Sequence, residues 1–241
     1  MQARVQRTTV GRMTRLAMAC ALALAVAPTP ASAATKPYVF DLGARSDFVS
    51  QTNLVQCVGA SMQMMLNMLR PGADRTAGTQ LQLQDLARAW SPRRPVGRER
   101  RGASVVGWAS GLNLVGAGPY LVVGTTTLDD AMQTAARAMR LTGKPVGLLM
   151  WRGRHAWVMS GFHATGDPLT GDVRVTAAIV EDPLYPRDSR TWGPSPAPGE
   201  ALTMRELGRQ FVPRRGSSSL TGLSGKYVLV VPFQFTMRTM H

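Results

Sequence analysis

The hydrophobic pattern changes its period halfway along the chain, and this change limits the fold more than any other feature. In the first half, apolar residues recur at helical spacing in four stretches, 56 to 70, 79 to 90, 104 to 115 and 127 to 143. The second half instead has short runs rich in Val, Ile and aromatic residues, at 145 to 151, 155 to 163, 174 to 181 and 227 to 233. This order predicts an α+β fold in which N-terminal helices pack against a C-terminal antiparallel sheet.

The segment before the last strand has a different character. It is rich in proline from residue 183 to 202, which predicts an irregular excursion from the sheet. Thr203 and Glu206 then have the spacing of a capping box, which predicts a short helix over 203 to 211.

The N-terminus has the three parts of a secretory signal peptide. Basic residues precede the apolar run from Leu16 to Ala27, and Ala31-Ser32-Ala33 matches an A-x-A cleavage site. The run is shorter than the ~20 residues that span a bilayer. We expect residues 1–33 to be the signal peptide and 34–241 to be a single domain that is secreted or periplasmic. No later segment is predicted to cross a membrane.

The chain is basic after the predicted cleavage. Its 24 Lys and Arg residues against 14 Asp and Glu residues give a net charge of about +10, which favours an anionic partner such as a bacterial cell envelope. The densest basic cluster, at 91 to 102, is interrupted by Pro and Gly and indicates a solvated loop. No zinc-binding spacing, nucleotide-binding glycine pattern or nucleic-acid motif accompanies it. We therefore predict no cofactor and no metal, and we do not expect nucleic acid as a partner.

Only one cysteine remains after the predicted cleavage. Cys20 lies inside the apolar part of the signal peptide, so Cys57 has no partner for an intramolecular disulfide. An unpaired cysteine in a secreted chain indicates either an intermolecular bridge or a reactive thiol. Cys57 stands at the predicted start of a helix, and a helix N-terminus stabilises a thiolate.

The predicted hairpin around the link ATGDPLTGD brings one histidine close to a carboxylate. Antiparallel pairing sets His155 beside Glu181 or Asp182. At the other end of the hairpin it sets His163 beside Val173. A carboxylate next to an imidazole can hold the ring as a general base. One residue of register decides between Glu181 and Asp182, so both remain candidates.

These residues resemble the papain-like cysteine peptidase superfamily. Gln51 stands six residues before Cys57 at the start of a helix. His155 begins a later strand within Gly-Arg-His-Ala-Trp-Val, and Asp182 closes the following strand within Val-Glu-Asp-Pro. The pattern is most similar to the bacterial branch that resembles the bacteriocin-processing (double-glycine leader) peptidases. The resemblance implies a nucleophile, a general base and acid, an orienting residue and an oxyanion-hole donor, which are Cys57, His155, Asp182 and Gln51 respectively.

The resemblance does not extend to the substrate. Gln56 stands where peptidases that process leader peptides usually carry an acidic residue, and no nucleotide-binding motif of an exporter is present. The sequence therefore predicts a secreted cysteine peptidase, or a related amide hydrolase, that acts on a peptide or protein through a thioester acyl-enzyme. Two alternatives stay open: a non-catalytic, envelope-associated binding protein with a papain-like fold, and a transglutaminase-like acyl transferase that uses the same three residues.

Overall fold

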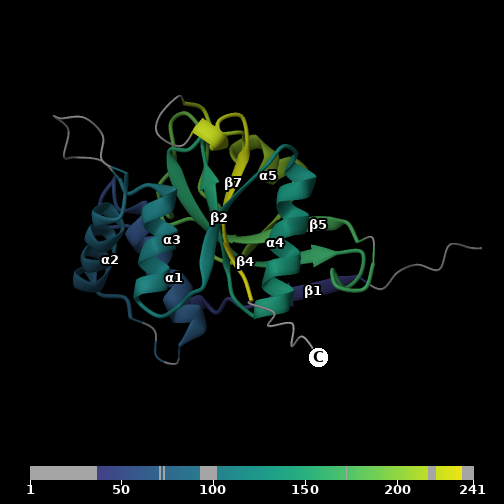
Figure 1. The fold of residues 1–241 in the computed structure, drawn as a ribbon, viewed down its shortest axis with the longest axis horizontal. Coiled ribbons are helices and arrows are strands. Elements are labelled where there is room, and N and C mark those ends of the chain that lie inside the picture. Colours follow the sequence, from purple (N-terminus) through teal and green to yellow (C-terminus); the bar gives the residue numbers. More distant parts are fainter. Residues whose placement is uncertain are drawn as a thin grey trace, which may run out of the picture. The chain divides into compact units, whose positions relative to one another are not determined.

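A seven-stranded antiparallel sheet separates two groups of helices (Figure 1). The computed structural model describes residues 37–70, 72, 74–92, 102–171, 173–216 and 221–234. The predicted signal peptide lies outside these residues, as does most of the basic cluster at 91 to 102. No helix in the described part of the chain is long and apolar enough to cross a membrane.

All five predicted helices are present, and each begins and ends within two residues of the predicted bounds. They are α1 (Cys57–Leu69), α2 (Ala77–Ala89), α3 (Val105–Leu114), α4 (Leu128–Thr142) and α5 (Met204–Gln210). Local signals fix their ends. The Thr127 hydroxyl caps α4 by accepting the Asp130 N–H, and Gly143 ends the helix in the left-handed conformation. Thr203 and Glu206 form the predicted capping box of α5.

The sheet contains three strands that the sequence pattern did not predict. Its order is β2-β7-β3-β4-β5-β6, and β1 also pairs with β4. The predicted strands are β3 (Val146–Met150), β4 (His155–Ala164), β5 (Val175–Glu181) and β7 (Tyr227–Pro232). The additional strands are β1 (Tyr38–Asp41), β2 (Tyr120–Thr125) and β6 (Glu200–Thr203). The strands β1 and β6 have four residues each, and Tyr120 of β2 is the one fully buried residue in the three strands, so none of them forms a run of buried apolar residues.

Both faces of the sheet are covered, and the side chains of each central strand alternate between them. Along β4, Val158 packs with the core under α1, α2 and α3, whereas Trp157 packs with the core under α4 and α5. Along β7, Val230 packs with the core under α1, α2 and α3, and Leu229 packs with the core under α4 and α5. The predicted packing of N-terminal helices against the sheet is confirmed, and α4 is the helix that crosses to the other face (Figure 1).

The hairpin of β4 and β5 has a different register from the predicted one. Glu181 pairs with Val158 rather than with His155. His163 pairs with a residue four positions away from its expected partner. The predicted cross-strand pairing of His155 with Glu181 or Asp182 is therefore wrong, and His155 lies beyond the last pair of this ladder.

The closed end of the hairpin explains this shift. The backbone N–H of Thr165 donates to the Arg174 carbonyl, and the Thr165 hydroxyl accepts the Arg174 N–H, so pairing continues further into the link than expected. Two irregularities along the β4–β5 ladder leave the difference between the observed and the predicted register almost unchanged at the end near His155. Hydrophobic alternation specifies which face a residue occupies, but it does not specify where a loop of this length closes.

Candidate active site

Three segments that are distant in sequence meet at one end of the sheet. Cys57 is the first residue of α1, His155 is the first residue of β4, and Asp182 directly follows β5. All three side chains are buried, with exposed fractions of 8%, 4% and 0%. The His155 imidazole is hydrogen-bonded to Asp182, and Cys57 lies close enough to raise the pKa of the ring. The structure thus joins the thiol, the imidazole and the carboxylate in one series.

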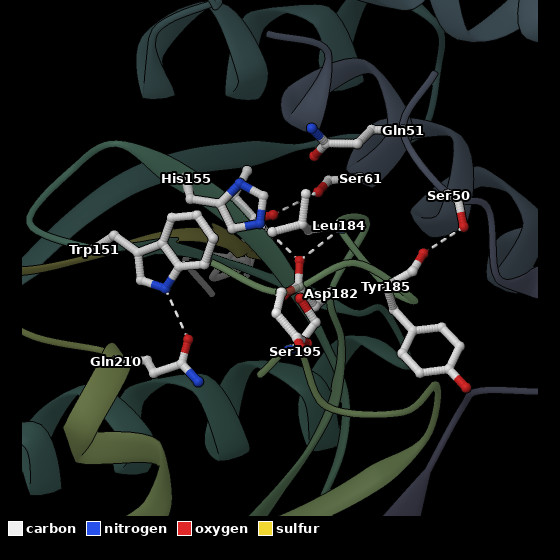
Figure 2. Close-up of polar contacts among 12 residues, drawn as sticks. Ser50, Gln51, Ser61, Trp151, His155, Asp182, Leu184, Tyr185, Ser195 and Gln210 are labelled. Atoms are coloured by element: carbon white, nitrogen blue, oxygen red, sulfur yellow. Dashed lines mark hydrogen bonds and ion pairs between the residues drawn. The ribbon is translucent and has the colours of Figure 1, made fainter. Parts of the chain in front are cut away.

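Asp182, and not Glu181, is the carboxylate that contacts the imidazole. Its Oδ1 lies 2.7 Å from His155 Nε2 and also accepts the backbone N–H of Leu184 at 2.8 Å (Figure 2). Because Asp182 follows the end of the strand, its side chain reaches His155 without a cross-strand pair. With Nε2 engaged by Asp182, Nδ1 is the ring nitrogen that remains to exchange a proton with Cys57.

The environment of His155 favours the charged form of its ring. Burial alone would lower the pKa, but the hydrogen bond with Asp182 and the interaction with the nearby Cys57 thiol outweigh it and raise the pKa of His155 from 6.5 to about 9. The charged form of the ring is therefore favoured at neutral pH. A cation beside a sulfur favours the thiolate form of that sulfur.

The start of α1 presents backbone donors close to the thiol. The N–H groups of Cys57 and Val58 have no acceptor among the described residues, and the side chain of Gln56 does not cap the helix. The unpaired N–H groups at a helix N-terminus carry partial positive charge and favour a nearby anion. Sequence analysis predicted this position for Cys57, and the structure confirms that it begins a buried helix.

Two buried glutamines of α2 hold the first turn of α1 and the loop before it. Gln84 Oε1 accepts the N–H of Gly59 at 2.8 Å. Gln80 accepts the Thr52 N–H and donates to the Ser50 carbonyl. Gly59 permits this close contact, because a Cβ atom there would lie 2.5 Å from the Gln80 carbonyl oxygen. Sequence analysis did not identify these glutamines, although their i, i+4 spacing places them on one face of α2.

Gln51 lies in this same loop and is buried. Its backbone N–H donates to the Pro183 carbonyl at 2.7 Å, which ties the loop to the segment that follows Asp182. Its Nε2 donates one hydrogen bond to the Asn53 carbonyl at 2.8 Å, so one Nε2 hydrogen is left. Its Oε1 has no partner among the described residues. The donor role that the resemblance implies for Gln51 stays a prediction.

The aromatic side chain of Trp151 covers the imidazole of His155. Trp151 stacks on His155 with a centroid distance of 4.0 Å and an interplanar angle of 18°. The Trp151 Nε1–H donates to Gln210 Oε1 at 2.8 Å, which fixes the indole ring (Figure 2). Trp192 lies parallel to Trp151, with 6.4 Å between the ring centroids. The position of Trp151 in the tight link before His155 was the signal available in the sequence.

Glu181, the other carboxylate considered from sequence, lies elsewhere. It pairs with Val158, and its Oε2 is buried without a partner among the described residues. Burial raises the pKa of Glu181 to about 8, with further contributions in the same direction from Asp41 and Asp47, while a hydrogen bond from the Gly199 backbone opposes them. Glu181 is therefore largely protonated at neutral pH and does not serve as the anionic partner of His155.

Comparison with family models and with curated proteins finds no match for this sequence. Within the described residues, no group of three or more His, Cys, Asp or Glu side chains has the arrangement of a metal site. What the geometry offers is a thiol beside a proton-transfer group, with an anionic support hydrogen-bonded to that group and backbone donors beside the sulfur. Such a series can attack a carbonyl carbon and move the proton that the reaction requires.

Proposed function

We propose that the protein is an extracytoplasmic thiol hydrolase that cleaves peptide or related amide bonds, with Cys57 as the nucleophile. The observation that carries this proposal is the position of His155, which is hydrogen-bonded to Asp182 and lies close enough to Cys57 for the thiol to raise the pKa of the ring. The resemblance to papain-like cysteine peptidases, which rests on the same residues, supports the same activity. The predicted signal peptide supports its location.

The first half of the reaction forms a thioester. The Cys57 thiolate attacks the carbonyl carbon, and a C–S bond forms while the carbonyl oxygen takes up negative charge. When the C–N bond breaks, the His155 imidazolium gives its proton to the departing amine. Asp182 keeps the ring oriented and stabilises its charge through the bond to Nε2.

The second half returns the protein to its starting state. Water attacks the thioester carbon, and neutral His155 accepts one of its protons. The C–S bond then breaks, which releases a carboxylic acid and restores the thiolate and imidazolium. The backbone N–H of Cys57 and the remaining Nε2 hydrogen of Gln51 are the donors proposed for the oxyanion in both halves.

The buried imidazole and carboxylate favour catalysis over the non-catalytic alternative. A Cys57 that served only for packing would gain nothing from a buried imidazolium, because burying a charge carries a large cost in free energy. A buried imidazole hydrogen-bonded to a carboxylate beside a thiol suits a site where negative charge appears during a reaction.

The test is incubation of the purified protein with a diverse peptide library, with products identified by mass spectrometry. We expect new peptide termini in the wild-type reaction and none after Cys57 has been alkylated. Alkylation must map to Cys57 for this result to count. An identical product pattern before and after complete alkylation would contradict the proposal. Products joined to an added amine, in place of free acids, would identify the acyl transferase instead.

A further inference from the structure

We propose that Trp151, Arg152 and Trp192 form a shelf beside the imidazole that binds a carboxylate group of the substrate. We call these three residues the Arg152 shelf. The inference rests on the proposed function, because it assigns the substrate class of the same site. The class is a peptide or amide that carries a carboxylate close to the scissile bond.

The shelf is connected to the reacting groups by a continuous series of ring contacts. Trp151 stacks on His155 at 4.0 Å, and Trp192 lies parallel to Trp151 at 6.4 Å. The Arg152 guanidinium carbon lies 5.8 Å from the centroid of the Trp192 ring. A guanidinium over an indole face is held by a cation–π interaction and keeps its N–H groups at the edge available.

The backbone of the link between β3 and β4 is held in an unusual conformation that displays this arginine. Trp151, Arg152 and Gly153 have φ values of 54°, 60° and 94°. Positive φ is uncommon for residues other than glycine and carries a cost that surrounding contacts must offset. Those contacts are present: the Trp151 N–H donates to the Gln210 carbonyl, and the Arg215 N–H donates to the Arg152 carbonyl. Residues in this condition are concentrated at ligand sites.

The segments that carry and follow the shelf are rich in exposed arginine and poor in carboxylates. Arg152 is exposed, and none of the ion pairs among the described residues includes it. Arg154 is a further exposed arginine in the same link, and Arg215, which is also exposed, contacts the link through its backbone. Arg187 and Arg190 are exposed in the segment that follows Asp182. Between residues 183 and 199 the only acidic residue is Asp188.

A carboxylate is the ligand that fits this arrangement. Guanidinium and carboxylate groups match in shape and form paired, charge-assisted hydrogen bonds. The parts of the Trp151 and Trp192 rings that remain exposed add an apolar surface for the chain that carries the carboxylate. The carboxylate belongs either to an acidic side chain or to the end of a chain, and both sources present the same group.

Two alkylating reagents test the shelf without knowledge of the natural substrate. Iodoacetate carries a carboxylate, and iodoacetamide is its neutral analogue of nearly the same size. We would measure the rate of Cys57 alkylation by each reagent and take the ratio of the two rates. The ratio corrects for changes in thiol reactivity, which affect both reagents alike.

We expect Arg152→Gln to lower the iodoacetate-to-iodoacetamide ratio about two- to fivefold, as expected for the loss of one exposed charge contact. Arg152→Lys, which keeps the charge, should retain most of the ratio. The matched control is Arg174→Gln, because Arg174 is also exposed but lies at the opposite end of β5 from Asp182.

An unchanged ratio in Arg152→Gln, with rapid reaction of both reagents, would overturn the shelf alone. Slow reaction of wild-type Cys57 with both reagents would overturn the proposed function and the shelf with it.

Matched peptides then distinguish the two carboxylate sources. In one pair Glu is exchanged for Gln near the cleaved bond, and in the other a free C-terminus is exchanged for a carboxamide. We expect the wild-type enzyme to prefer the anionic member of at least one pair, and Arg152→Gln to lose that preference. Equal cleavage within both pairs by the wild-type enzyme would contradict the assignment.

Discussion

The helices on the two faces of the sheet differ in the polarity of the side chains that they bury. On one face, the helix that begins with the thiol, α1, buries Ser61, Gln63 and Asn67 along with its apolar residues. On the other face, the buried positions of α4 are all Ala or Met. The same strands support both helices, since neighbouring residues of β4 and β7 point to opposite faces.

This difference separates stability from positioning. The α4 face gains its free energy from apolar burial, which is favourable but has little directional preference. The α1 face replaces part of that burial with directed hydrogen bonds, such as Ser61 Oγ to the Ala156 carbonyl at 3.3 Å and Asn67 Nδ2 to the Asp47 carbonyl at 3.2 Å. Directed bonds fix the orientation of α1, and α1 carries Cys57. Substitutions on the two faces should therefore have different effects.

The largest effect should come from the α1 face and should be on activity. We expect Cys57→Ala to reduce peptide hydrolysis by about 10³-fold or more, because no other thiol is available among the described residues. The free energy of unfolding should change by only about 1 kcal/mol, since the deletion removes one small side chain. Product analysis and denaturant unfolding of the same preparation check the two parts. Retention of more than about a tenth of the wild-type rate would remove Cys57 from the mechanism.

The converse substitution lies on the α4 face. Met139 is fully buried in the core under α4, so we expect Met139→Ala to lower the free energy of unfolding by about 2–5 kcal/mol. At temperatures where the variant is folded, Cys57 should be alkylated at the wild-type rate. Leu141→Ala on the same helix is the matched control, because Leu141 is 54% exposed. A large loss of thiol reactivity in folded Met139→Ala would show that the two faces are not independent.

The buried carboxyl of Glu181 provides a test of the α1 face through pH. The pKa of Glu181 is raised by burial from 4.5 to about 8, so its contribution to stability is complete below pH 4.5 and is lost as the pH rises through 8. One pKa unit corresponds to ~1.4 kcal/mol, so the decline can reach several kcal/mol. Glu181→Gln should remove this decline and be more stable than wild type at pH 8 to 9.

Unfolding curves between pH 4 and pH 9 would measure this difference. The raised pKa of His155 adds a decline of its own between pH 6.5 and 9, and it should remain in both proteins, so the comparison is between variant and wild type at each pH. Glu200→Gln, at an exposed position, is the control. Parallel curves for wild type and Glu181→Gln would contradict the assignment.

The smallest of these effects concerns the support of the nucleophile. Gln84→Met keeps the length of the side chain but leaves the buried Gly59 N–H without its acceptor. We expect a loss of about 1–3 kcal/mol in the free energy of unfolding and a drop of a few-fold in the alkylation rate of Cys57. Gln82→Met, at an exposed position on the same helix, should change neither quantity. A stability loss without any change in thiol reactivity would reduce Gln84 to a purely structural role.

The helices and the α+β class could be predicted because their signals are local. The caps at Thr127 and Thr203 and the 3.6-residue period act within one element, and the structure confirms them. The strands β1, β2 and β6 could not be predicted, since few of their residues are buried and each depends on a distant partner. Tyr38 of β1 pairs with Ala164, and Tyr120 of β2 pairs with Pro232.

The candidate site was predictable in its members and less so in its geometry. Cys57 and His155 were identified from residue type and position, and Asp182 was preferred to Glu181 only through the family resemblance; the structure brings the three together. The expected route, a cross-strand pair, was wrong, because the hairpin closes at Thr165 and Asp182 reaches the imidazole from beyond its strand. Gln84 and the stacking of Trp151 on His155 are tertiary contacts, so no sequence spacing specified them.

The central claim is that His155 and Asp182 keep Cys57 as a reactive thiolate, and the rate of its alkylation by iodoacetamide at pH 6 tests this claim most directly. We predict that wild-type Cys57 reacts at least about tenfold faster than free cysteine, because a thiolate is the reactive species and free cysteine is almost entirely protonated at this pH. His155→Ala should remove the advantage. Reaction of wild-type Cys57 no faster than free cysteine, or at the same rate in His155→Ala, would contradict the account.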